Sequence, residues 1–413
     1  MLNRKINVLV IYTDTVGGVG FYRSSQPHKY LLEKYNEEFN VVFETKPNFQ
    51  NLDDFSLYDI IHFHKGLYPQ QNEFYKLLEY CKTNGIVTII DIDDYWTLNT
   101  HHPQYNLVKE KKLDDIIRKS LQLCDYVTTT TDLFAERIKK LNKNVKVLPN
   151  AINPNDGSFK INKKSCDKIR IGMVMGSTHK YDMMTMDDFV KKLPKEILDK
   201  VCFVLCGFDT RGQIKTIDPV TKQLKQRPIQ PKESVWYEYE KMITNNYKNL
   251  SPEYTNFLMT FAPNVQYPNE INEGYKRKWT KPMNEYFKHY EEVDILLAPL
   301  EETEFNYCKS QLKVIECAFS HTAFIGSDFG PYKIDLKPIF KKGGEIDETG
   351  NAILIEKKRA HKDWAKAIEK LVKRPELIKL LQDNLEKDCC EKYNLDTITK
   401  DRVEFYKKIV KKD

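Results

Sequence analysis

Residues Ile6–Tyr12 read INVLVIY, an almost continuous apolar run near the start of the chain. A strand buried on both faces has this composition, and such strands occur in the middle of parallel sheets. Further β-rich runs follow, separated by helical stretches such as Asn72–Asn84 and Leu113–Cys124. This alternation predicts a doubly wound parallel sheet. Its other strands are expected at Val41–Glu44, Ile60–His64, Val87–Ile92, Tyr126–Thr129 and Val145–Leu148.

A second alternating half begins after a polar, turn-rich segment at residues 153–167. We therefore predict an α/β protein with two Rossmann-like domains, at residues 1–152 and 168–390. An insertion at about 208–285 is polar and rich in proline and tyrosine, and we expect a helix at Ser234–Tyr247 within it. The second domain is expected to contain strands at Ile169–Val174, Val201–Cys206, Val293–Ala298, Ala323–Gly326 and Ala352–Ile355, and helices at His361–Leu371 and Glu376–Tyr393.

The composition is that of a globular protein, with 41% hydrophobic and 30% charged residues among 413. No apolar run reaches the roughly 18 residues that span a bilayer, and the N-terminus lacks the features of a signal peptide. The nine cysteines show no disulfide framework, so we expect free thiols and a cytoplasmic protein. A net charge of +6 is lower than that of most nucleic-acid-binding proteins, but it is compatible with anionic substrates or with contact to acidic lipid headgroups.

A glycine-rich segment, Thr15–Gly20, follows the first predicted strand and precedes a helix expected at Tyr22–Tyr35. Glycines let a backbone approach a ligand closely, and a helix N-terminus attracts phosphate. The spacing does not fit a dinucleotide fingerprint, and no acidic residue follows at a suitable distance for a ribose. A tight turn without a ligand is the alternative.

Two more turns follow predicted strands of the second domain. Gly176–His179, with Asp182 beyond it, has the residues to hold a diphosphate at a helix start, although Ser177 or Thr178 could equally serve as a helix cap. Ser327–Tyr332 contains a Gly-Pro turn at Gly330 that could bring backbone amides to a sugar, or could be a plain turn.

The segment Phe305–Glu316 is the most informative one. On a helix, Lys309, Lys313 and Glu316 would share one face. Two cations and a carboxylate suit a nucleoside diphosphate, because the lysines can neutralise phosphates while the glutamate accepts hydrogen bonds from a ribose. The alternative is a solvated Lys–Glu face, which contributes little to stability.

Two strand ends of the first domain also carry polar groups. His62 and His64 alternate with apolar residues, so they share one side of their strand, where a structural role is the alternative to a functional one. Asp91, Asp93 and Asp94 cluster at the end of the next predicted strand. They could bind an acceptor's hydroxyl groups or a metal ion, but no histidine or glutamate lies nearby at ligand spacing, so a metal site is not favoured.

Together these motifs resemble the GT-B glycosyltransferases, in particular the large retaining family that uses nucleotide sugars (glycosyltransferase group 1, family 4-like). The similar features span nearly the whole chain. They are Gly17–Gly20, His62–His64, Val145–Asn150 (VKVLPN), Gly176–His179 with Asp182, Asp294–Leu300 (DILLAPL), Lys309–Ser310 with Lys313 and Glu316, and Gly326–Pro331. Many members carry an earlier glutamate at the position that Cys308 takes here, and a cationic pair where His179 and Lys180 stand.

The resemblance implies two Rossmann-like domains that face each other across a cleft, with a C-terminal helix at 391–413 packing back on the first domain. It implies a retaining transfer of sugar from a UDP- or GDP-linked donor to a glycan or lipid-linked acceptor, without metal or cofactor. The implied catalytic residues are Lys309, Lys313, Glu316 and His64. The implied donor-binding residues are Gly17, Gly18, Gly176, Ser177, His179, Ser310 and Gly330, and the implied acceptor-binding residues are Arg23, Asp93 and Asp94.

Three alternatives remain open from the sequence. The acceptor could be a modified base in DNA, which the mild positive charge permits but does not favour. The protein could bind nucleotide sugars or glycans without turnover, which the missing earlier glutamate would explain. An epimerase of the same architecture would release free nucleotide without an acceptor. Peripheral contact with the inner face of a membrane is compatible with the lysine-rich C-terminal helices at Leu377–Tyr393 and Ile398–Val410.

Overall fold

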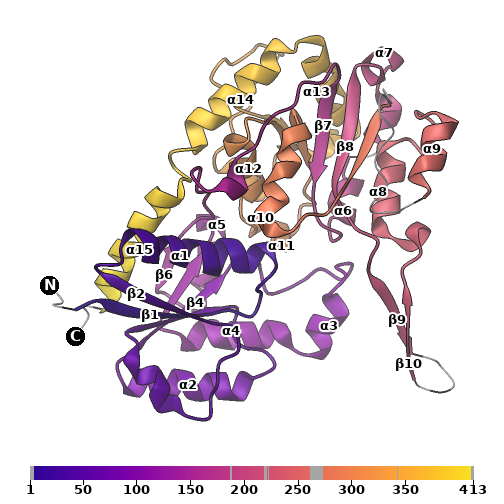
Figure 1. Cartoon of the computed structure of the whole chain (residues 1–413). Coiled ribbons are helices and arrows are strands. Elements are labelled where there is room, and N and C mark those ends of the chain that lie inside the picture. The colour runs from indigo at the N-terminus through magenta and orange to yellow at the C-terminus, as the bar shows by residue number, and fades with distance from the viewer. Residues whose placement is uncertain are drawn as a thin grey trace.

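The computed structural model describes residues 4–186, 188–217, 221, 223–260, 273–341 and 343–410. The chain forms two α/β domains, each built on a six-stranded sheet (Figure 1). The N-terminal sheet has the order β2-β1-β3-β4-β5-β6, and all neighbours are parallel. Its strands are β1 (Ile6–Ile11), β2 (Phe39–Glu44), β3 (Ile60–His64), β4 (Val87–Ile92), β5 (Tyr126–Thr129) and β6 (Val145–Val147), close to the predicted ranges.

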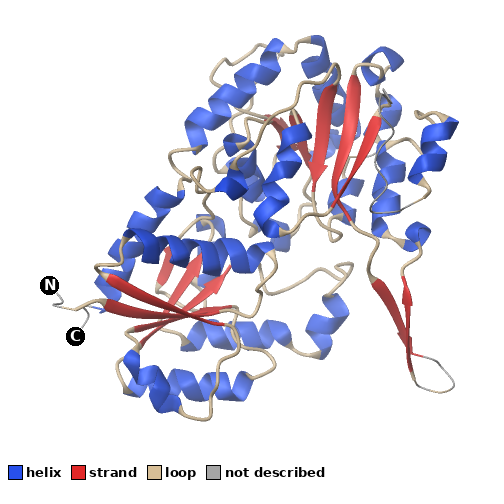
Figure 2. Ribbon diagram, in the orientation of Figure 1, coloured by secondary structure: helices blue, strands red, loops and turns tan. Residues whose placement is uncertain are grey.

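Helices cover both faces of this sheet (Figure 2). One face packs against α1 (Gln26–Lys34) and α15 (Leu395–Val410), through residues such as Leu31 and Tyr406. The other face packs against α2 (Gln71–Thr83), α4 (Leu113–Leu123) and α5 (Asp132–Ile138). The expected helix at Tyr22–Tyr35 is split, because a π-helix, η1 (Gly20–Ser25), precedes α1. The remaining helical elements are η2 (Leu52–Leu57) and α3 (Tyr105–Glu110).

The C-terminal sheet is also parallel and has the order β11-β8-β7-β12-β13-β14. Its strands are β7 (Ile169–Val174), β8 (Val201–Phe208), β11 (Tyr275–Trp279), β12 (Ile295–Ala298), β13 (Ala323–Ser327) and β14 (Ile353–Ile355). Helical elements around it are α6 (Lys180–Met184), η4 (Phe189–Lys192), α7 (Lys195–Leu198), α11 (Glu304–Tyr307), α12 (Leu312–Phe319), η7 (Gly330–Lys333), η8 (Lys357–Arg359), α13 (Ala360–Lys373) and α14 (Glu376–Cys389). The prediction of two Rossmann-like domains is confirmed.

The predicted insertion contributes the edge strand β11 and a projecting hairpin (Figure 1). The hairpin pairs β9 (Gln213–Ile217) with β10 (Leu224–Pro228) in antiparallel register. The sequence did not indicate it, because polar residues occupy both sides of these strands and leave no period-two apolar pattern. The expected helix is present as α8 (Val235–Ile243), and η5 (Pro231–Glu233), α9 (Pro252–Leu258), α10 (Met283–Tyr286) and η6 (Phe287–Glu292) complete the segment.

The chain crosses between the domains twice, and the two crossings are hydrogen-bonded to each other. Ile152 forms an isolated parallel bridge with Asn394. The amide of Ile152 donates to the carbonyl of Tyr393 over 3.0 Å, and the amide of Leu395 donates to the carbonyl of Ile152 over 2.9 Å. η3 (Gly157–Phe159) follows the first crossing, and the second leads from α14 on the C-terminal domain to α15 on the N-terminal one.

Both sheets reverse their strand order at a point where ligands bind in open α/β folds. In the N-terminal sheet the reversal lies between β1 and β3, and in the C-terminal sheet it lies between β7 and β12. The loops at the carboxyl ends of these strands contain most of the residues that the sequence singled out. Among the residues described, no helix is long and apolar enough to cross a membrane.

Candidate functional site

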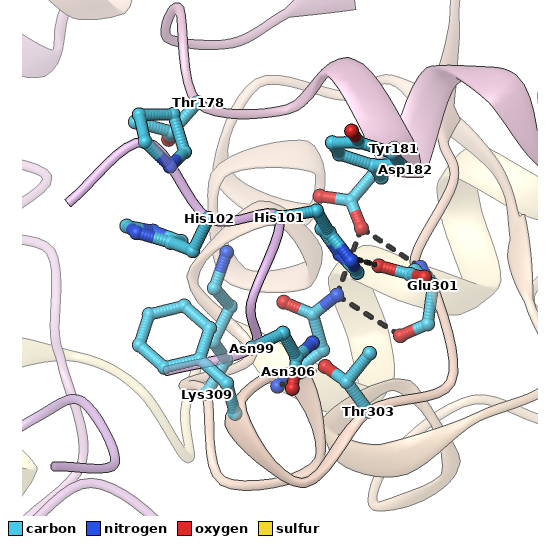
Figure 3. A pocket seen from close by; sticks show the side chains of 12 residues that line it. Asn99, His101, His102, Thr178, Tyr181, Asp182, Glu301, Thr303, Asn306 and Lys309 are labelled. Carbon is cyan, nitrogen blue, oxygen red and sulfur yellow. Dashed lines mark hydrogen bonds and ion pairs between the residues drawn. The ribbon is translucent and has the colours of Figure 1, made fainter. Parts of the chain in front are cut away.

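A pocket lies where the loops after β7 and β12 meet a loop of the N-terminal domain (Figure 3). The C-terminal domain contributes Thr178 and Asp182 after β7, and Glu301 and Lys309 after β12. The N-terminal domain contributes Asn99 and residues 101–103, from the long connection after β4. The pocket is therefore formed by both domains at the strand-order reversal of the C-terminal sheet.

Asp182 joins the two C-terminal loops that line this pocket. Its Oδ1 accepts hydrogen bonds from the amide of Glu301 and from Nδ2 of Asn306, both at 2.8 Å. Its Oδ2 lies 2.7 Å from Nδ1 of His179. Burial would raise the pKa of Asp182, but the hydrogen bond from His179 and the charge of Lys309 lower it below the usual value. Asp182 is therefore a buried anion that fixes both loops.

Lys309 lies before the helix and not on it, so the predicted shared helical face is wrong. The helix α12 begins at Leu312, and the preceding residue, Gln311, has φ −84° and ψ 32°. The Lys309 ammonium lies 5.1 Å from the centre of the Phe305 ring, on the wall of the pocket. None of the described residues forms an ion pair with it. Burial and then the charge of Lys309 lower the pKa values of His102 and His179.

Lys313 and Glu316 form an ion pair one turn into α12, with Nζ 2.8 Å from Oε2. Glu316 is fully buried, so the alternative of a solvated Lys–Glu face is excluded. The hydroxyl of Tyr290 donates to Glu316 Oε2 over 2.7 Å. Lys313 also donates to the hydroxyl of Tyr286 over 2.7 Å. Burial would lower the pKa of Lys313, but the Glu316 charge raises it above its usual value.

The N-terminal domain covers this ion pair through Tyr22 of η1. Tyr22 is buried in the same apolar cluster as Tyr290 and Val314. Burial, followed by the charge of Glu316, raises the pKa of Tyr22 well above its usual value. Oε1 of Glu316 has no hydrogen-bond partner among the described residues.

The glycine-rich segment is folded onto a carboxylate that the sequence reasoning missed. Asp14 Oδ1 accepts from the amide of Gly17 over 2.7 Å, and Oδ2 accepts from the amide of Gly20 over 3.1 Å. A Cβ on Gly20 would lie 1.7 Å from the carbonyl oxygen of Asp14, so the turn requires glycine there. These contacts fit the tight-turn interpretation. The Gly17 amide is already bonded to the Asp14 carboxylate. Gly18 lies against Met283 of the C-terminal domain, and a Cβ on Gly18 would lie 3.6 Å from the Met283 sulfur.

Arg23 is buried and engaged, so the expectation that it faces an acceptor is wrong. It is 1% exposed and forms a two-point ion pair with Asp91, at 3.0 and 2.7 Å. Its Nη1 donates to the carbonyl of Leu148 and to Oδ1 of Asn150. The hydroxyl of Thr128 donates to Asp91. A guanidinium with these bonds fixes the N-terminal sheet to the first crossing.

The carboxylates that follow β4 are held by Lys65, another residue that the sequence reasoning missed. The Nζ of Lys65 lies 2.9 Å from Asp93 Oδ1 and 3.0 Å from Asp94 Oδ2. His64 Nε2 lies 3.3 Å from the same Asp93 oxygen. Burial would raise the pKa of Asp93, but Lys65 and His64 lower it. Lys65 directly follows β3, and a basic residue at the end of a strand is the sequence feature that could have identified it.

The remaining predicted donor residues lie near the same loops. Gly176 and Ser177 are exposed, and the carbonyl of Ser177 accepts from the hydroxyl of Tyr239. Gly330 has a φ of +55°, and a Cβ there would lie 3.2 Å from the Cα of Tyr307, so glycine allows this turn to pack on α11. Ser310 accepts a hydrogen bond from Asn150 over 3.1 Å.

No family model matches the chain, and no curated protein matches it in sequence. Solved structures do match the fold over nearly all of its length. HepE from Anabaena, solved with UDP and glucose, aligns with a TM-score of 0.57 at 11% identity and covers 98% of this chain and 100% of that chain. A glycosyltransferase from Rickettsia africae aligns with a TM-score of 0.57 at 12% identity, covering 99% and 100%. The catalytic domain of starch synthase IV from Arabidopsis thaliana, bound to ADP and acarbose, aligns with a TM-score of 0.57 at 10% identity, covering 98% and 99%. This chain therefore has the GT-B fold, two Rossmann-like domains joined by paired crossings.

Proposed function

We propose that this protein is a glycosyltransferase that moves a sugar from a nucleotide sugar to a hydroxyl group. The observation that carries this proposal is Lys309, which lies in the interdomain pocket without an ion-pair partner among the described residues. A lysine placed this way is available to an anionic ligand. The similar structures support a nucleotide sugar as that ligand, since they include complexes with UDP, with UDP-glucose and with ADP.

The chemistry of glycosyl transfer requires positive charge at this place. Breaking the bond between the anomeric carbon and the diphosphate leaves negative charge on the departing group. Cations that are already in position stabilise this charge and lower the barrier. We assign this role to Lys309 and Lys313, with Glu316 accepting from the ribose and the Gly176 and Ser177 amides contacting the phosphates. His179 and Ser310 would complete the donor site, with Gly18 and Gly330 at its border.

The order of events follows from the burial of Glu316. Because Tyr22 is buried near Glu316, we expect the domains to separate before a donor binds in full. Their return would then place the sugar opposite the carboxyl ends of β3 and β4. His64, Asp93 and Asp94 would face the acceptor there, with Lys65 holding the carboxylates. Motion of this kind commonly accompanies substrate binding in two-domain enzymes.

We propose retention of the anomeric configuration and catalysis without a metal ion. In a retaining transfer the acceptor hydroxyl attacks from the side of the leaving group, and a phosphate oxygen of the donor takes its proton. The two lysines supply the charge that a metal would otherwise bring. We propose a UDP- or GDP-linked donor, a glycan or lipid-linked saccharide as acceptor, and a cytoplasmic site of action with peripheral contact to the membrane's inner face.

A thermal-shift panel tests the proposal directly. UDP, GDP and ADP, each alone and as its glucose conjugate, are added to the full chain and the melting temperature is measured. At a hundred times its dissociation constant, a ligand should stabilise the fold by about 2.7 kcal/mol. Absence of a shift with every compound would overturn the proposal.

An acceptor panel separates the remaining alternatives. With the donor that binds best, a glycan acceptor should increase the release of nucleoside diphosphate and become labelled. Labelling of DNA, falling steeply with salt, would favour the modified-base alternative. Binding without any turnover would favour a non-catalytic protein, and nucleotide release without an acceptor would favour an epimerase.

A further inference from the structure

Both interdomain crossings send one side chain to the same short loop of the C-terminal domain. From the first crossing, Nδ2 of Asn150 donates to Oγ of Ser310 over 3.1 Å. From the second crossing, the hydroxyl of Tyr393 accepts from Nε2 of Gln311 over 2.7 Å. Ser310 and Gln311 are consecutive residues between Lys309 and α12. The two crossings together form the hinge between the domains. This hinge is therefore hydrogen-bonded directly to the loop that follows Lys309 and precedes Lys313, the proposed donor-binding cations.

Asn150, which makes the first of these contacts, is itself held in place by Arg23. Asn150 is 5% exposed, and its Oδ1 accepts from Nη1 of Arg23 over 3.0 Å. Arg23 is in turn fixed by the two-point ion pair with Asp91 on β4. With its oxygen held by Arg23, the Asn150 amide points its nitrogen at Ser310. The N-terminal sheet thereby sets the position of the Ser310 hydroxyl.

Tyr393, which makes the second contact, is held in place by Asp335. Tyr393 is 1% exposed, and its hydroxyl donates to Oδ2 of Asp335 over 2.6 Å. Because that proton is used, the hydroxyl oxygen is left to accept from Gln311, which is 2% exposed. The carbonyl of Gln311 accepts the amides of Val314 and Ile315 in the first turn of α12. Fixing Gln311 therefore fixes the start of the helix that bears Lys313 and Glu316.

We propose that Asn150 and Tyr393 are positioning residues that set the conformation of the Lys309–Gln311 loop from the two crossings and so couple the hinge to donor binding. This inference rests on the proposed function of that loop. The backbone bonds between Ile152, Tyr393 and Leu395 keep the two crossings in register beside this loop. A rotation of the N-terminal domain about this point changes the contact between Asn150 and Ser310, whereas Tyr393 stays bonded to Asp335 of the C-terminal domain and holds Gln311. The loop adopts its binding conformation only when both anchors are in place.

The variant Tyr393→Phe tests this inference most cleanly. It removes one hydroxyl, keeps the ring in the apolar cluster, and leaves Asp335 its ion pair with Lys392. Losing one buried hydrogen bond that orders the loop should weaken binding of the best nucleoside diphosphate about five- to ten-fold by titration calorimetry. The KM for the donor should rise similarly, while the KM for the acceptor stays unchanged. Asn150→Ala should act in the same direction, with its stability measured alongside because Arg23 loses an acceptor.

The matched control is Tyr254→Phe, in α9 of the insertion. The hydroxyl of Tyr254 donates to the carbonyl of Tyr275 over 2.7 Å, so this variant also loses a buried hydrogen bond. It should lower the melting temperature and leave nucleotide affinity unchanged. Equal affinity in Tyr393→Phe and wild type would overturn the coupling alone. Equal weakening in both variants would also overturn it, because the effect would then be one of general stability. A wild type that binds no nucleotide would overturn the proposed function and this inference with it.

Discussion

His101 of the N-terminal domain lies against Glu301 of the C-terminal domain, with Nε2 2.8 Å from Oε2 across the mouth of the pocket (Figure 3). The ring of His101 also lies 3.9 Å from that of Tyr181, centre to centre. The neighbouring His102 packs on Phe305, with ring centres 5.3 Å apart. These contacts close one side of the pocket in the present arrangement of the domains.

His101→Ala should loosen this closure. We expect faster amide hydrogen exchange in residues 97–103 and around Tyr181, since the variant removes the hydrogen bond and the ring contact together. The stability should fall by about 1 kcal/mol or less, because the pair is partly solvated. His321→Ala is the matched control, since it removes an exposed pair with Asp383 within the C-terminal domain. Unchanged exchange near Tyr181 would contradict the closure.

Lys309→Ala should remove transfer without affecting stability. The side chain has no ion pair among the described residues, so the free energy of unfolding should stay within about 0.5 kcal/mol of wild type. Losing a preorganised charge at a leaving group should lower the rate constant about 10²- to 10³-fold. Lys379→Ala, an exposed lysine paired with Asp383, should retain full activity. A Lys309→Ala enzyme with wild-type kcat would remove this lysine from the mechanism.

Single substitutions at the Lys313–Glu316 pair should affect stability as well as transfer. Removing Lys313 leaves a fully buried carboxylate without its counter-charge, which costs roughly 3–5 kcal/mol. The double variant Lys313→Met, Glu316→Gln removes both charges and should recover much of the stability but none of the transfer. Thermal unfolding and a transfer assay on the three proteins measure the two effects separately. Recovery of transfer in the double variant would show that the charges act only in folding.

Stability should fall as the pH decreases below about 6.5, because of a buried histidine. His62 is fully buried, and no described residue bonds either ring nitrogen. Burial is the main cause that lowers its pKa to about 3, and Arg402 and Arg23 add to it against the opposing charge of Asp91. The unfolded chain therefore binds a proton at a pH where the native one does not. The stabilisation is complete above pH 6.5 and is lost progressively as the pH falls toward 3.

His62→Phe tests this dependence. Denaturant unfolding at pH 7, 6, 5 and 4 should give a shallower decline in the variant than in wild type, by roughly 3 kcal/mol between pH 7 and pH 4. His28 lies next to His62 and has its own pKa lowered, so part of the decline should remain. An identical decline in both proteins would contradict the assignment to His62.

Transfer should be insensitive to chelation. Lys65 already neutralises Asp93 and Asp94, so these carboxylates have no need of a cation. The initial rate should be the same with EDTA as with added Mg²⁺. A rate that falls with EDTA and returns with Mg²⁺ would instead implicate the Asp93–Asp94 cluster as a metal site.

The sequence predicted the elements well because their signals are local. The apolar run at Ile6–Ile11 and the four-residue run at Ile295–Ala298 are buried strands, as strands covered on both faces must be. The projecting hairpin was missed because its two strands, Gln213–Ile217 and Leu224–Pro228, show no alternating apolar pattern. The helical face assigned to Lys309 was wrong because periodicity alone does not show where a helix begins, and α12 begins after Lys309.

The order of residues along this chain determined two parallel sheets, the loops that follow their strands, and the residue types available at the strand ends. Which of those residues are free to act was decided only by tertiary contacts. Arg23 looked available in the sequence but is engaged by Asp91, whereas Lys309 has no ion-pair partner among the described residues. Asn150 and Tyr393 lie beside the Lys309–Gln311 loop because the chain crosses between the domains twice at one point. Such partners are distant in sequence, and close packing of the two domains alone brings them within hydrogen-bond distance.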